Sequence, residues 1–390
     1  MKSRDGTLDL IRGMSALLVM LGHLRGFIFL DFGQLKSADL LAKAFYFATG
    51  LGHQAVMVFF VLSGYFVGGS VISSLKKGRF SWIAYTRARL TRLWMVLLPA
   101  LILTLAVDSL GNAWNPLAYA GGLSARFMSG PTLLDPAVYD SLTFIGNLIF
   151  VQTIWVPVYG SNSPLWSLAN EFWYYVMFPV LAVALFQQES KRWFVSVIQL
   201  LSCGLIAWWL PYNLVLSGLI WLMGAGVWWL LWMTETRDQM SDPNRGGRPI
   251  LSRIVRFIRG LGWRLIGGLL FLATLAASKS NHWLGSDYAV GITFALWLIS
   301  LPGSSHGNGI LKRFATGLSE ISYTLYVVHF PLLFFAAAVL LRGRQFSADC
   351  EGYLWFSGLA VAILAISSGM WWLFERNTDR VRKLLWSGWT

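Results

Sequence analysis

Apolar runs of about twenty residues recur along this chain, and they limit its fold more than any other feature. A helix of that length rises about 30 Å, which matches the hydrocarbon core of a bilayer. Only 13% of the residues are charged, about half the share that is usual in soluble domains. The sequence therefore predicts an all-α, polytopic integral membrane bundle with about ten transmembrane helices. The predicted spans are 8–29, 54–75, 91–108, 164–186, 193–210, 213–233, 263–279, 284–302, 316–341 and 353–374.

Lysine and arginine gather in five clusters between or after these runs, and the clusters predict the orientation of the chain. Cytoplasmic loops of membrane proteins are enriched in these two residues. All five clusters fall on one side only if the ten runs cross the membrane and the short, partly polar segment 142–158 does not. We therefore expect a multi-pass protein of the cell inner membrane with both termini in the cytoplasm, loop 109–141 outside, and 142–158 as a candidate re-entrant segment. The clusters are 76–92, 191–192, 237–259, 312–313 and 376–383.

Charge and cysteine content argue against several other classes of protein. The net charge of +13 lies in short loops between apolar runs, so membrane lipids are expected as partners and nucleic acid is not. The two cysteines are too few for a disulfide framework or a four-thiolate metal site, and no metal is expected. No small-residue cleavage site follows the first apolar run, which therefore predicts a retained helix and not a removed signal peptide.

We expect a single membrane domain over residues 1–390. Within it, residues 234–262 form a basic linker that the charge pattern places in the cytoplasm. The residues Asp242-Pro243-Asn244 and Gly246-Gly247 indicate a flexible connector, and an amphipathic, arginine-rich stretch follows. This pattern is typical of a solvated loop with an interfacial helix.

The first apolar run contains Arg12 near its start and His23 deep inside it. In a helix that turns about 100° per residue, the two side chains share one face and lie roughly 16 Å apart along the axis. Ionisable groups at such depth are costly and usually line a protein interior or a cavity. Because imidazole titrates near neutral pH, His23 is suited to take a proton from a hydroxyl group.

Two later spans contain further ionisable residues. Glu171 lies about two turns inside the fourth predicted span. A membrane-embedded carboxylate needs a partner or a proton, so Glu171 could orient the imidazole of His23 or bind a polar acceptor. His329 lies near the middle of the ninth predicted span, where it is either a buried structural imidazole or the base itself.

Arginines and a serine complete the set of candidates. Arg12, Arg87 and Arg89 would form a cluster on the cytoplasmic side that suits phosphates, because guanidinium forks match phosphate oxygens. The positive-inside rule alone would also explain Arg87 and Arg89. Ser63 follows Phe-Phe-Val-Leu and precedes Gly64, and its small neighbours equally favour close helix packing.

Five motifs follow one another along the chain between residue 8 and about residue 380. They are Leu-Asp-x-x-Arg-Gly, with Asp9, Arg12 and the later His23; Phe-Phe-Val-Leu-Ser-Gly, with Ser63; Arg-x-Arg, at Arg87 and Arg89; Leu-Trp-Ser-Leu-x-x-Glu, ending at Glu171; and Ser-Tyr-x-Leu-Tyr-x-x-His, with Tyr323 and His329. In this order they resemble the acyltransferase family 3 membrane proteins, integral enzymes that acylate cell-surface carbohydrates and some other acceptors.

The resemblance implies a membrane O-acyltransferase, in the first instance an O-acetyltransferase. Its donor would be cytoplasmic acyl-CoA, expected to be acetyl-CoA, which is a co-substrate and not a permanently bound cofactor. Its acceptor would be a hydroxyl of a polysaccharide or lipid-linked glycan on the external side. The implied catalytic residues are His23 and Glu171, with Arg12, Arg87 and Arg89 at the donor. Residues expected to bind substrate or support the site are Asp9, Ser63, Tyr323 and His329.

Two departures from the family pattern limit this transfer. The tail reads Glu375-Arg376-Asn377, whereas family tails often read Glu-x-Pro, so Glu375 is left out of the expected site. Some members append an esterase-like domain, and this sequence ends at Thr390 without one. We therefore expect the membrane domain alone to modify the acceptor.

Two other functions are compatible with the same residues. Buried His, Glu and Arg residues on several helices would also serve the proton relay of a proton-coupled transporter, although the two halves show no matching pair of broken helices. A non-catalytic partner in a glycan export system is the third alternative. Hydrolysis of acyl-CoA by the purified protein would separate the enzyme from both.

Overall fold

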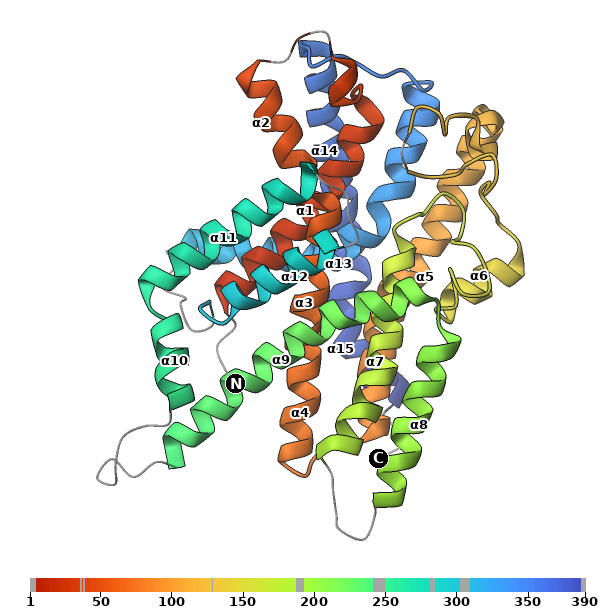
Figure 1. The fold of residues 1–390 in the computed structure, drawn as a ribbon. Coiled ribbons are helices and arrows are strands. Elements are labelled where there is room, and N and C mark those ends of the chain that lie inside the picture. The colour runs from red at the N-terminus through yellow and green to blue at the C-terminus, as the bar shows by residue number, and fades with distance from the viewer. Residues whose placement is uncertain are drawn as a thin grey trace. The chain divides into compact units, whose positions relative to one another are not determined.

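The computed structural model describes residues 5–35, 37, 39–127, 129–186, 193–240, 250–280, 285–301 and 309–386. Within these residues the fold is all-α, as predicted, and the extended segments form only isolated bridges (Figure 1). The α-helices are α1 (Gly6–Ile28), α2 (Leu40–Thr49), α3 (Gly52–Ser63), α4 (Gly69–Lys76), α5 (Trp82–Trp114), α6 (Ser141–Leu148), α7 (Leu165–Phe186), α8 (Trp193–Trp209), α9 (Tyr212–Met240), α10 (Ile250–Ile258), α11 (Leu261–Ser280), α12 (Gly285–Leu298), α13 (Gly309–Phe335), α14 (Cys350–Leu373) and α15 (Thr378–Trp386).

Short 3₁₀ and π turns join or extend some of these helices. They are η1 (Phe32–Gln34), η2 (Gly64–Gly68), η3 (Ala118–Gly122), η4 (Ala336–Leu340) and η5 (Glu375–Asn377). Because η2 connects α3 to α4 and η4 extends α13, these helices run on through a local change of pitch.

The protein has enough long apolar helices for a multi-pass membrane protein. Among the described residues, seven helical stretches are long and apolar enough to cross a bilayer, and an eighth exists if the bent pair of α10 and α11 counts as one span. The predicted number of about ten is approximate, because α8 has 17 residues and α12 has 14. Both are shorter than the roughly 18 residues that a full span needs.

Four short helices, α2, α6, α10 and α15, lie outside the predicted spans. The helix α2 starts where the Asp39 side chain accepts a hydrogen bond from the Ala42 amide at 2.7 Å. The helix α6 has only 8 residues and cannot cross a bilayer. It is followed by turns with positive φ at Phe150 and Thr153. The segment 142–158 is therefore not a transmembrane helix, which agrees with the orientation that the charge clusters predict.

The chain forms two compact units, each assembled from several stretches. The first comprises Met1–Arg12, Val56–Phe80 and Asn170–Thr316. The second comprises Gly13–Ala55, Ser81–Ala169 and Gly317–Thr390. Of the predicted basic linker, residues 234–240 belong to α9 and 250–262 to α10 and the start of α11, whereas 241–249 lie outside the described residues.

Close helix contact in the first unit depends on two glycines. A Cβ atom at Gly64 would lie 1.8 Å from the carbonyl oxygen of Trp221, and one at Gly224 would lie 1.8 Å from that of Val61. No larger residue fits at either position without moving the backbone of the neighbouring helix. These glycines let η2 and α9 approach closely, as small residues do between membrane helices.

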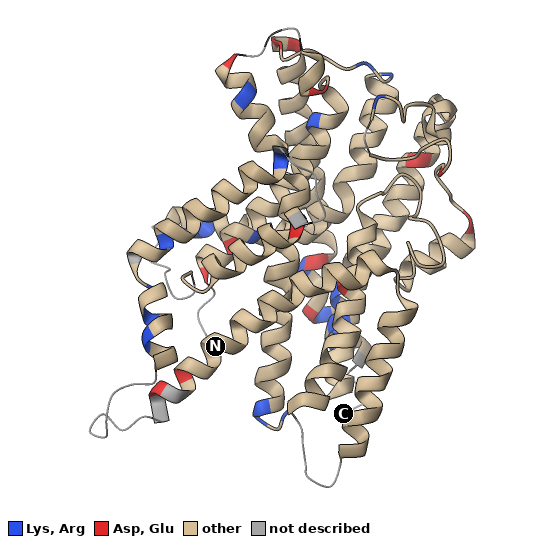
Figure 2. Ribbon diagram, in the orientation of Figure 1, with Lys and Arg blue, Asp and Glu red and all other residues tan. Residues whose placement is uncertain are grey.

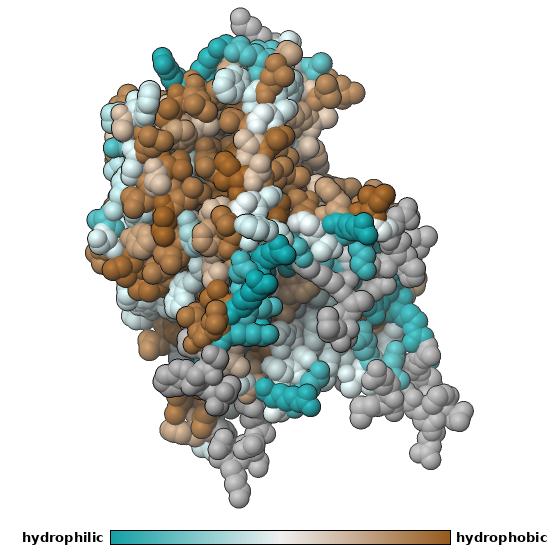
Figure 3. Space-filling view, turned by 180° about the vertical axis from the view of Figure 1, so that it is seen from behind, coloured by the Kyte–Doolittle hydropathy of each residue, from teal (hydrophilic) through white to brown (hydrophobic). Residues whose placement is uncertain are grey.

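Much of the surface is apolar, as a lipid-facing surface must be. Large hydrophobic side chains are exposed along α8 and α11, including Phe194, Leu201, Trp208 and Leu269. Figure 3 shows a face on which such side chains gather over a broad area. Figure 2 shows that most of the helical ribbon carries no charged residue.

Candidate active site

His23 and His329 lie next to each other in the second unit. Their ring centroids are 5.4 Å apart, with an angle of 32° between the ring planes. The ring of Phe330 stands edge-on to His23 at a centroid distance of 5.0 Å. His23 is half-buried on α1, whereas His329 on α13 is fully buried. Two residues that are more than 300 positions apart in sequence therefore form a pair of imidazoles.

The hydrogen bonding of His329 determines which of its ring nitrogens can accept a proton. Its Nδ1 atom lies 3.0 Å from the carbonyl oxygen of Leu325. A carbonyl oxygen can only accept, so Nδ1 carries the hydrogen and donates it. In a neutral imidazole Nε2 then has the free lone pair. Nε2 is buried and has no hydrogen-bond partner anywhere in the described part of the chain.

A buried nitrogen without a partner is unusual, because most buried polar side-chain atoms are hydrogen-bonded. The walls around it are largely apolar. Phe27 lies edge-on to Phe330 at 5.4 Å and to Phe127 at 4.9 Å. Such surroundings strengthen any hydrogen bond that a ligand makes there, because the effective dielectric constant is low. Nε2 of His329 is therefore a buried acceptor that no described residue uses.

Two of the sequence motifs meet beside this pair. The hydroxyls of Ser167 and Tyr326 are 2.5 Å apart, and the Tyr326 hydroxyl also donates to the Pro164 carbonyl at 3.5 Å. The Tyr326 ring lies 6.0 Å from that of His329. Ser167 and Tyr326 were not among the predicted site residues, although both lie inside quoted motifs.

A buried polar network fastens the loop before α7 to the helices of the second unit. Asp108 accepts hydrogen bonds from the amide of Ser161 at 2.7 Å, from its hydroxyl at 2.8 Å, and from the Tyr139 hydroxyl at 3.4 Å. Burial, together with the nearby Asp108, raises the pKa of Tyr139, which keeps this hydroxyl protonated as a donor. Asn162 donates to the Val327 carbonyl at 2.9 Å, two residues before His329. The loop is therefore held against α13 close to the imidazoles.

Glu171 lies in the first unit, within a network of neutral donors. Its Oε1 atom accepts hydrogen bonds from the Ser63 hydroxyl at 2.7 Å and from the Tyr175 hydroxyl. Trp221 in turn donates from Nε1 to the Ser63 oxygen at 3.1 Å. No hydrogen bond from a described residue reaches Oε2 of Glu171. The carboxylate is therefore fixed through one oxygen and open at the other.

The local backbone explains how Ser63 reaches this network. The π turn η2 begins at Gly64, directly after Ser63. Single π turns within helices are rare and occur often at functional sites. Ser63 was predicted either as a helix-packing residue or as a supporting residue. Its hydroxyl bonds to Glu171 and the adjacent Gly64 packs against Trp221, so its role in the site stays a prediction. Tyr175 and Trp221 were not predicted, although Tyr175 stands one helical turn after Glu171.

The predicted donor arginines occupy the starts of two helices. Arg12 on α1 pairs with Asp9 at 3.5 Å, and the two side chains are 21% and 7% exposed. Arg87 and Arg89 lie in the first two turns of α5 and are half-buried. The guanidinium of Arg89 lies over the Tyr85 ring at 5.6 Å. Arg87 and Arg89 point about 200° apart around the helix, so they face different directions.

Two further contacts fix α13: Tyr323 joins it to α5, and Glu375 joins it to η5. The Tyr323 hydroxyl donates to the Leu93 carbonyl at 3.4 Å. Glu375 accepts from the Thr324 hydroxyl at 2.6 Å and from its amide at 3.3 Å. Glu375 was left out of the predicted site, and these contacts give it a role in holding η5 against α13. Within the described residues, no three His, Cys, Asp or Glu side chains are close enough together to ligate one metal ion.

Comparison with known proteins identifies the family of this chain. A family model that is described as an acyltransferase domain, Acyl_transf_3, matches residues 5–375. The chain is also 25% identical over 341 residues to the acyltransferase MdmB of Streptomyces mycarofaciens, a match that covers 81% of this chain and 78% of the relative. No solved structure matches the chain. Since the family model covers nearly the whole sequence, this membrane protein belongs to the Acyl_transf_3 family of acyltransferases.

Proposed function

We propose that this membrane acyltransferase is an O-acetyltransferase that moves an acetyl group from acetyl-CoA to a hydroxyl of a cell-surface or exported carbohydrate. Family membership supports acyl transfer. The observation that carries the choice of a hydroxyl acceptor is the half-buried His23 beside the buried Nε2 of His329. A hydroxyl must lose its proton to attack a thioester, and a neutral imidazole in an apolar pocket can take that proton.

The chemistry balances with one imidazole as base and then acid. The acceptor hydroxyl gives its proton to His23 while its oxygen attacks the thioester carbonyl carbon. The carbon–sulfur bond then breaks, an ester remains on the acceptor, and the thiolate of coenzyme A takes the proton from His23. His23 is the more exposed of the two imidazoles, which supports its choice as the base that meets the substrates.

His329 would then act as a positioning residue. Its Nε2 lone pair makes no hydrogen bond with any described residue in this structure. In the reacting complex it would accept an N–H of His23, which would leave the other ring nitrogen of His23 free as the base. The Leu325 carbonyl supports this role, because it fixes the hydrogen of His329 on Nδ1. The remaining proposed roles are phosphate binding by Arg12, Arg87 and Arg89, with Asp9 orienting Arg12, and acceptor contacts by Glu171 with Ser63 and Tyr323 as supports.

Two assays test this function. Purified protein in lipid nanodiscs should release free coenzyme A from acetyl-CoA, and faster when an acceptor carbohydrate is present. Mass spectrometry of surface glycans should find acetyl groups that vanish when the gene is deleted. Negative results in both assays would reject the proposed acetyltransferase activity. Proton-coupled uptake of a solute into proteoliposomes would favour a transporter instead.

We also propose that the protein lies in the inner membrane with both termini in the cytoplasm, which the charge clusters support. Reporter fusions at Arg79 and Lys383 should read cytoplasmic, and one at Asp135 should read external. A further predicted reporter position, Arg248, and the basic pair Lys191 and Arg192 lie outside the described residues. A cytoplasmic reading at Asp135 would overturn the orientation.

A further inference from the structure

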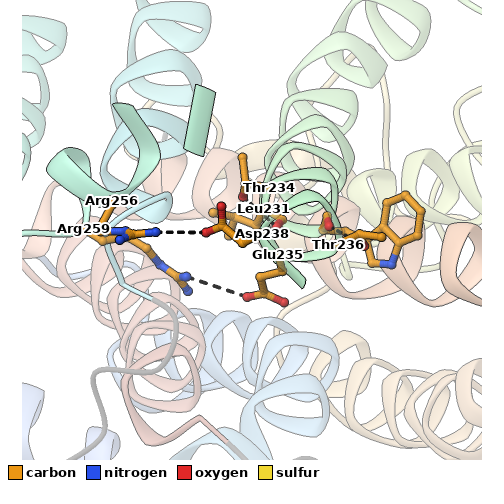
Figure 4. Close-up of polar contacts among 8 residues, drawn as sticks. Leu231, Thr234, Glu235, Thr236, Asp238, Arg256 and Arg259 are labelled. Carbon is orange, nitrogen blue, oxygen red and sulfur yellow. Dashed lines mark hydrogen bonds and ion pairs between the residues drawn. The ribbon is translucent and has the colours of Figure 1, made fainter. Parts of the chain in front are cut away.

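Two arginines at the end of α10 face two acidic residues at the end of α9. Arg256 donates a hydrogen bond from Nη2 to Oδ2 of Asp238 at 3.1 Å. Arg259 lies 3.7 Å from Glu235. Figure 4 shows both guanidinium groups pointing toward the two carboxylates. The two arginines, and likewise the two acids, stand three positions apart on their helices, so two neighbouring cations oppose two neighbouring anions within the first unit.

Neither ion pair is closely held. In the described part of the chain, Arg256 uses one of its five N–H groups, on a single oxygen of Asp238. The other oxygen of Asp238, Oδ1, is buried and has no hydrogen-bond partner there. The distance between Arg259 and Glu235 is longer than that of a hydrogen bond. Neither carboxylate therefore makes the forked, two-bond contact that a guanidinium group favours.

A buried hydroxyl lies on the same face of α10 as the two arginines. Ser252 is 3% exposed, and its Oγ atom has no hydrogen-bond partner among the described residues. Ser252, Arg256 and Arg259 occupy positions i, i+4 and i+7, which places them on one face of the helix. Buried polar atoms are seldom left without a partner. A hydroxyl and two guanidinium groups can all donate hydrogen bonds, so this face suits the several acceptor oxygens of a phosphate.

The cluster adjoins the start of α1, where the donor is expected. Tyr65, in η2, lies within electrostatic reach of Arg259 and Glu235. It is also within reach of Asp5, which directly precedes α1. Arg12 follows Asp5 by two helical turns, about 10 Å along the axis. In coenzyme A the 3′-phosphate and the diphosphate are attached to the same ribose, so cationic groups at this end of the unit can hold both parts of one nucleotide.

We propose that Arg256 and Arg259, together with Ser252, bind the 3′-phosphate of acyl-CoA. This site rests on the proposed function, because its ligand is the donor named there. The phosphate displaces the carboxylates of Glu235 and Asp238. A phosphate monoester carries about two negative charges near neutral pH and offers three acceptor oxygens, so it satisfies two guanidinium groups better than two singly bound carboxylates do. The displaced side chains are 49% and 33% exposed, and exposed ion pairs contribute little stability, so their exchange costs little.

The first test compares two donors that differ only in the 3′-phosphate. The full chain is titrated with acetyl-CoA and with acetyl-3′-dephospho-CoA in nanodiscs of phosphatidylcholine, a lipid without a phosphate monoester. The parent protein should bind acetyl-CoA about tenfold more tightly, as expected for charge-assisted hydrogen bonds. In Arg256→Gln/Arg259→Gln, the affinity for acetyl-CoA should fall to that for the dephospho donor, which should itself not change. Equal weakening for both donors would mean that the arginines only dock α10, and it would overturn the proposal.

A matched control removes an ion-paired arginine elsewhere. Arg382 on α15 lies 2.9 Å from Asp379, and Arg382→Gln should leave both affinities unchanged. If this variant lost the preference for acetyl-CoA as fully as the α10 variant, the site would be rejected. A parent protein that binds both donors equally well would also reject this site alone. A parent protein that binds neither donor would reject the proposed function as well.

The second test uses the sign of the effect. Glu235→Gln/Asp238→Asn breaks the same two ion pairs from the acidic side. If the pairs only dock α10, this variant should weaken donor binding as the arginine variant does. If the carboxylates compete with the phosphate, it should bind acetyl-CoA roughly two- to fivefold more tightly, which is the contribution of an exposed ion pair, with no such gain for the dephospho donor. Unchanged or weaker binding of acetyl-CoA in the acidic variant would overturn the proposal.

Discussion

The two polar centres of this protein differ in how their ionisable groups are hydrogen-bonded. Around Glu171, one carboxylate oxygen receives hydrogen bonds from Ser63 and Tyr175, and Trp221 supports the serine. Around His329, the Nε2 atom is buried without a partner. A polar group that is satisfied within the protein stabilises the fold, whereas one that is left open costs stability and is retained where a ligand can use it. The first centre is held by the protein through one carboxylate oxygen, whereas the second leaves a buried imidazole nitrogen open, and this difference supports the catalytic role proposed for the second.

The largest expected effect comes from removing the imidazole at position 23. His23→Ala should lower turnover by about 10²–10⁴-fold, which is the usual contribution of a general base. His23→Gln keeps similar size but cannot take a proton near neutral pH, so it should be nearly as inactive. Coenzyme A release in nanodiscs measures both. If His23→Gln retains near-full activity while His329→Gln is inactive, the base is His329 on α13 and not His23.

The arginines that we propose to bind the donor should give the next largest effect. Arg→Ala at position 12, 87 or 89 removes charge-assisted hydrogen bonds worth about 1.5–3 kcal/mol, so coenzyme A should bind about 10- to 150-fold more weakly. Arg→Lys keeps the charge but loses the forked guanidinium, so its affinity for coenzyme A should lie between those of the parent protein and the alanine variant. Isothermal titration in nanodiscs measures the affinity. Unchanged binding in all three alanine variants would leave these residues as signals of orientation only.

The holding role of the Glu171 centre can be tested with two adjacent tyrosines. Tyr175 donates to the Glu171 carboxylate, whereas Tyr174 donates to the Leu214 carbonyl at 2.7 Å. Loss of a bond to a charged group costs about 1.5–3 kcal/mol and loss of a neutral one about 0.5–1.5 kcal/mol. Tyr175→Phe should therefore destabilise the protein more than Tyr174→Phe in thermal unfolding in detergent. Equal losses would mean that the carboxylate is not held through Tyr175.

The smallest effect is expected at the exposed carboxylate of Asp140, which can be compared with the half-buried carboxylate of Glu171. Asp140 caps α6 by accepting hydrogen bonds from the Thr143 amide at 2.8 Å and its hydroxyl at 2.9 Å. These two bonds lower the pKa of Asp140. The cap therefore stabilises the helix above the ordinary pKa of an aspartate and is lost as pH falls through the lowered value.

Asp140→Asn keeps a capping side chain without a titrating group. The protection factors of the α6 amides, which compare their hydrogen exchange with the intrinsic rate at each pH, should then no longer fall at acid pH. In the parent protein they should fall. An identical pH dependence in parent and variant would remove Asp140 as its source.

Local sequence patterns predict the class of fold and mark the residues that carry chemical groups. Hydropathy is a property of local stretches, and a bilayer sets the length of helix that it accepts, so the apolar runs predicted an all-α membrane protein. The motif residues were also readable, because His23, Glu171 and His329 stand inside runs where ionisable groups are rare. Helix ends were predicted less well, and α8 and α12 are shorter than the predicted spans. The helix α2 was not predicted, because ten residues are too few to give the hydropathy signal of a full span.

Helix packing, which local patterns do not predict, sets which of these groups lie side by side. The sequence offered His329 as a structural imidazole or as a base, and helix packing placed its ring beside that of His23. In the sequence, nothing distinguishes Trp221 and Tyr175 from the other aromatic residues of the apolar runs. In the structure, both hydrogen-bond to Ser63, which itself bonds to Glu171. Contacts between distant helices depend on how ridges, glycines and side-chain volumes fit together, and no local pattern encodes that fit. The partner of each buried polar group is therefore a property of the packed bundle.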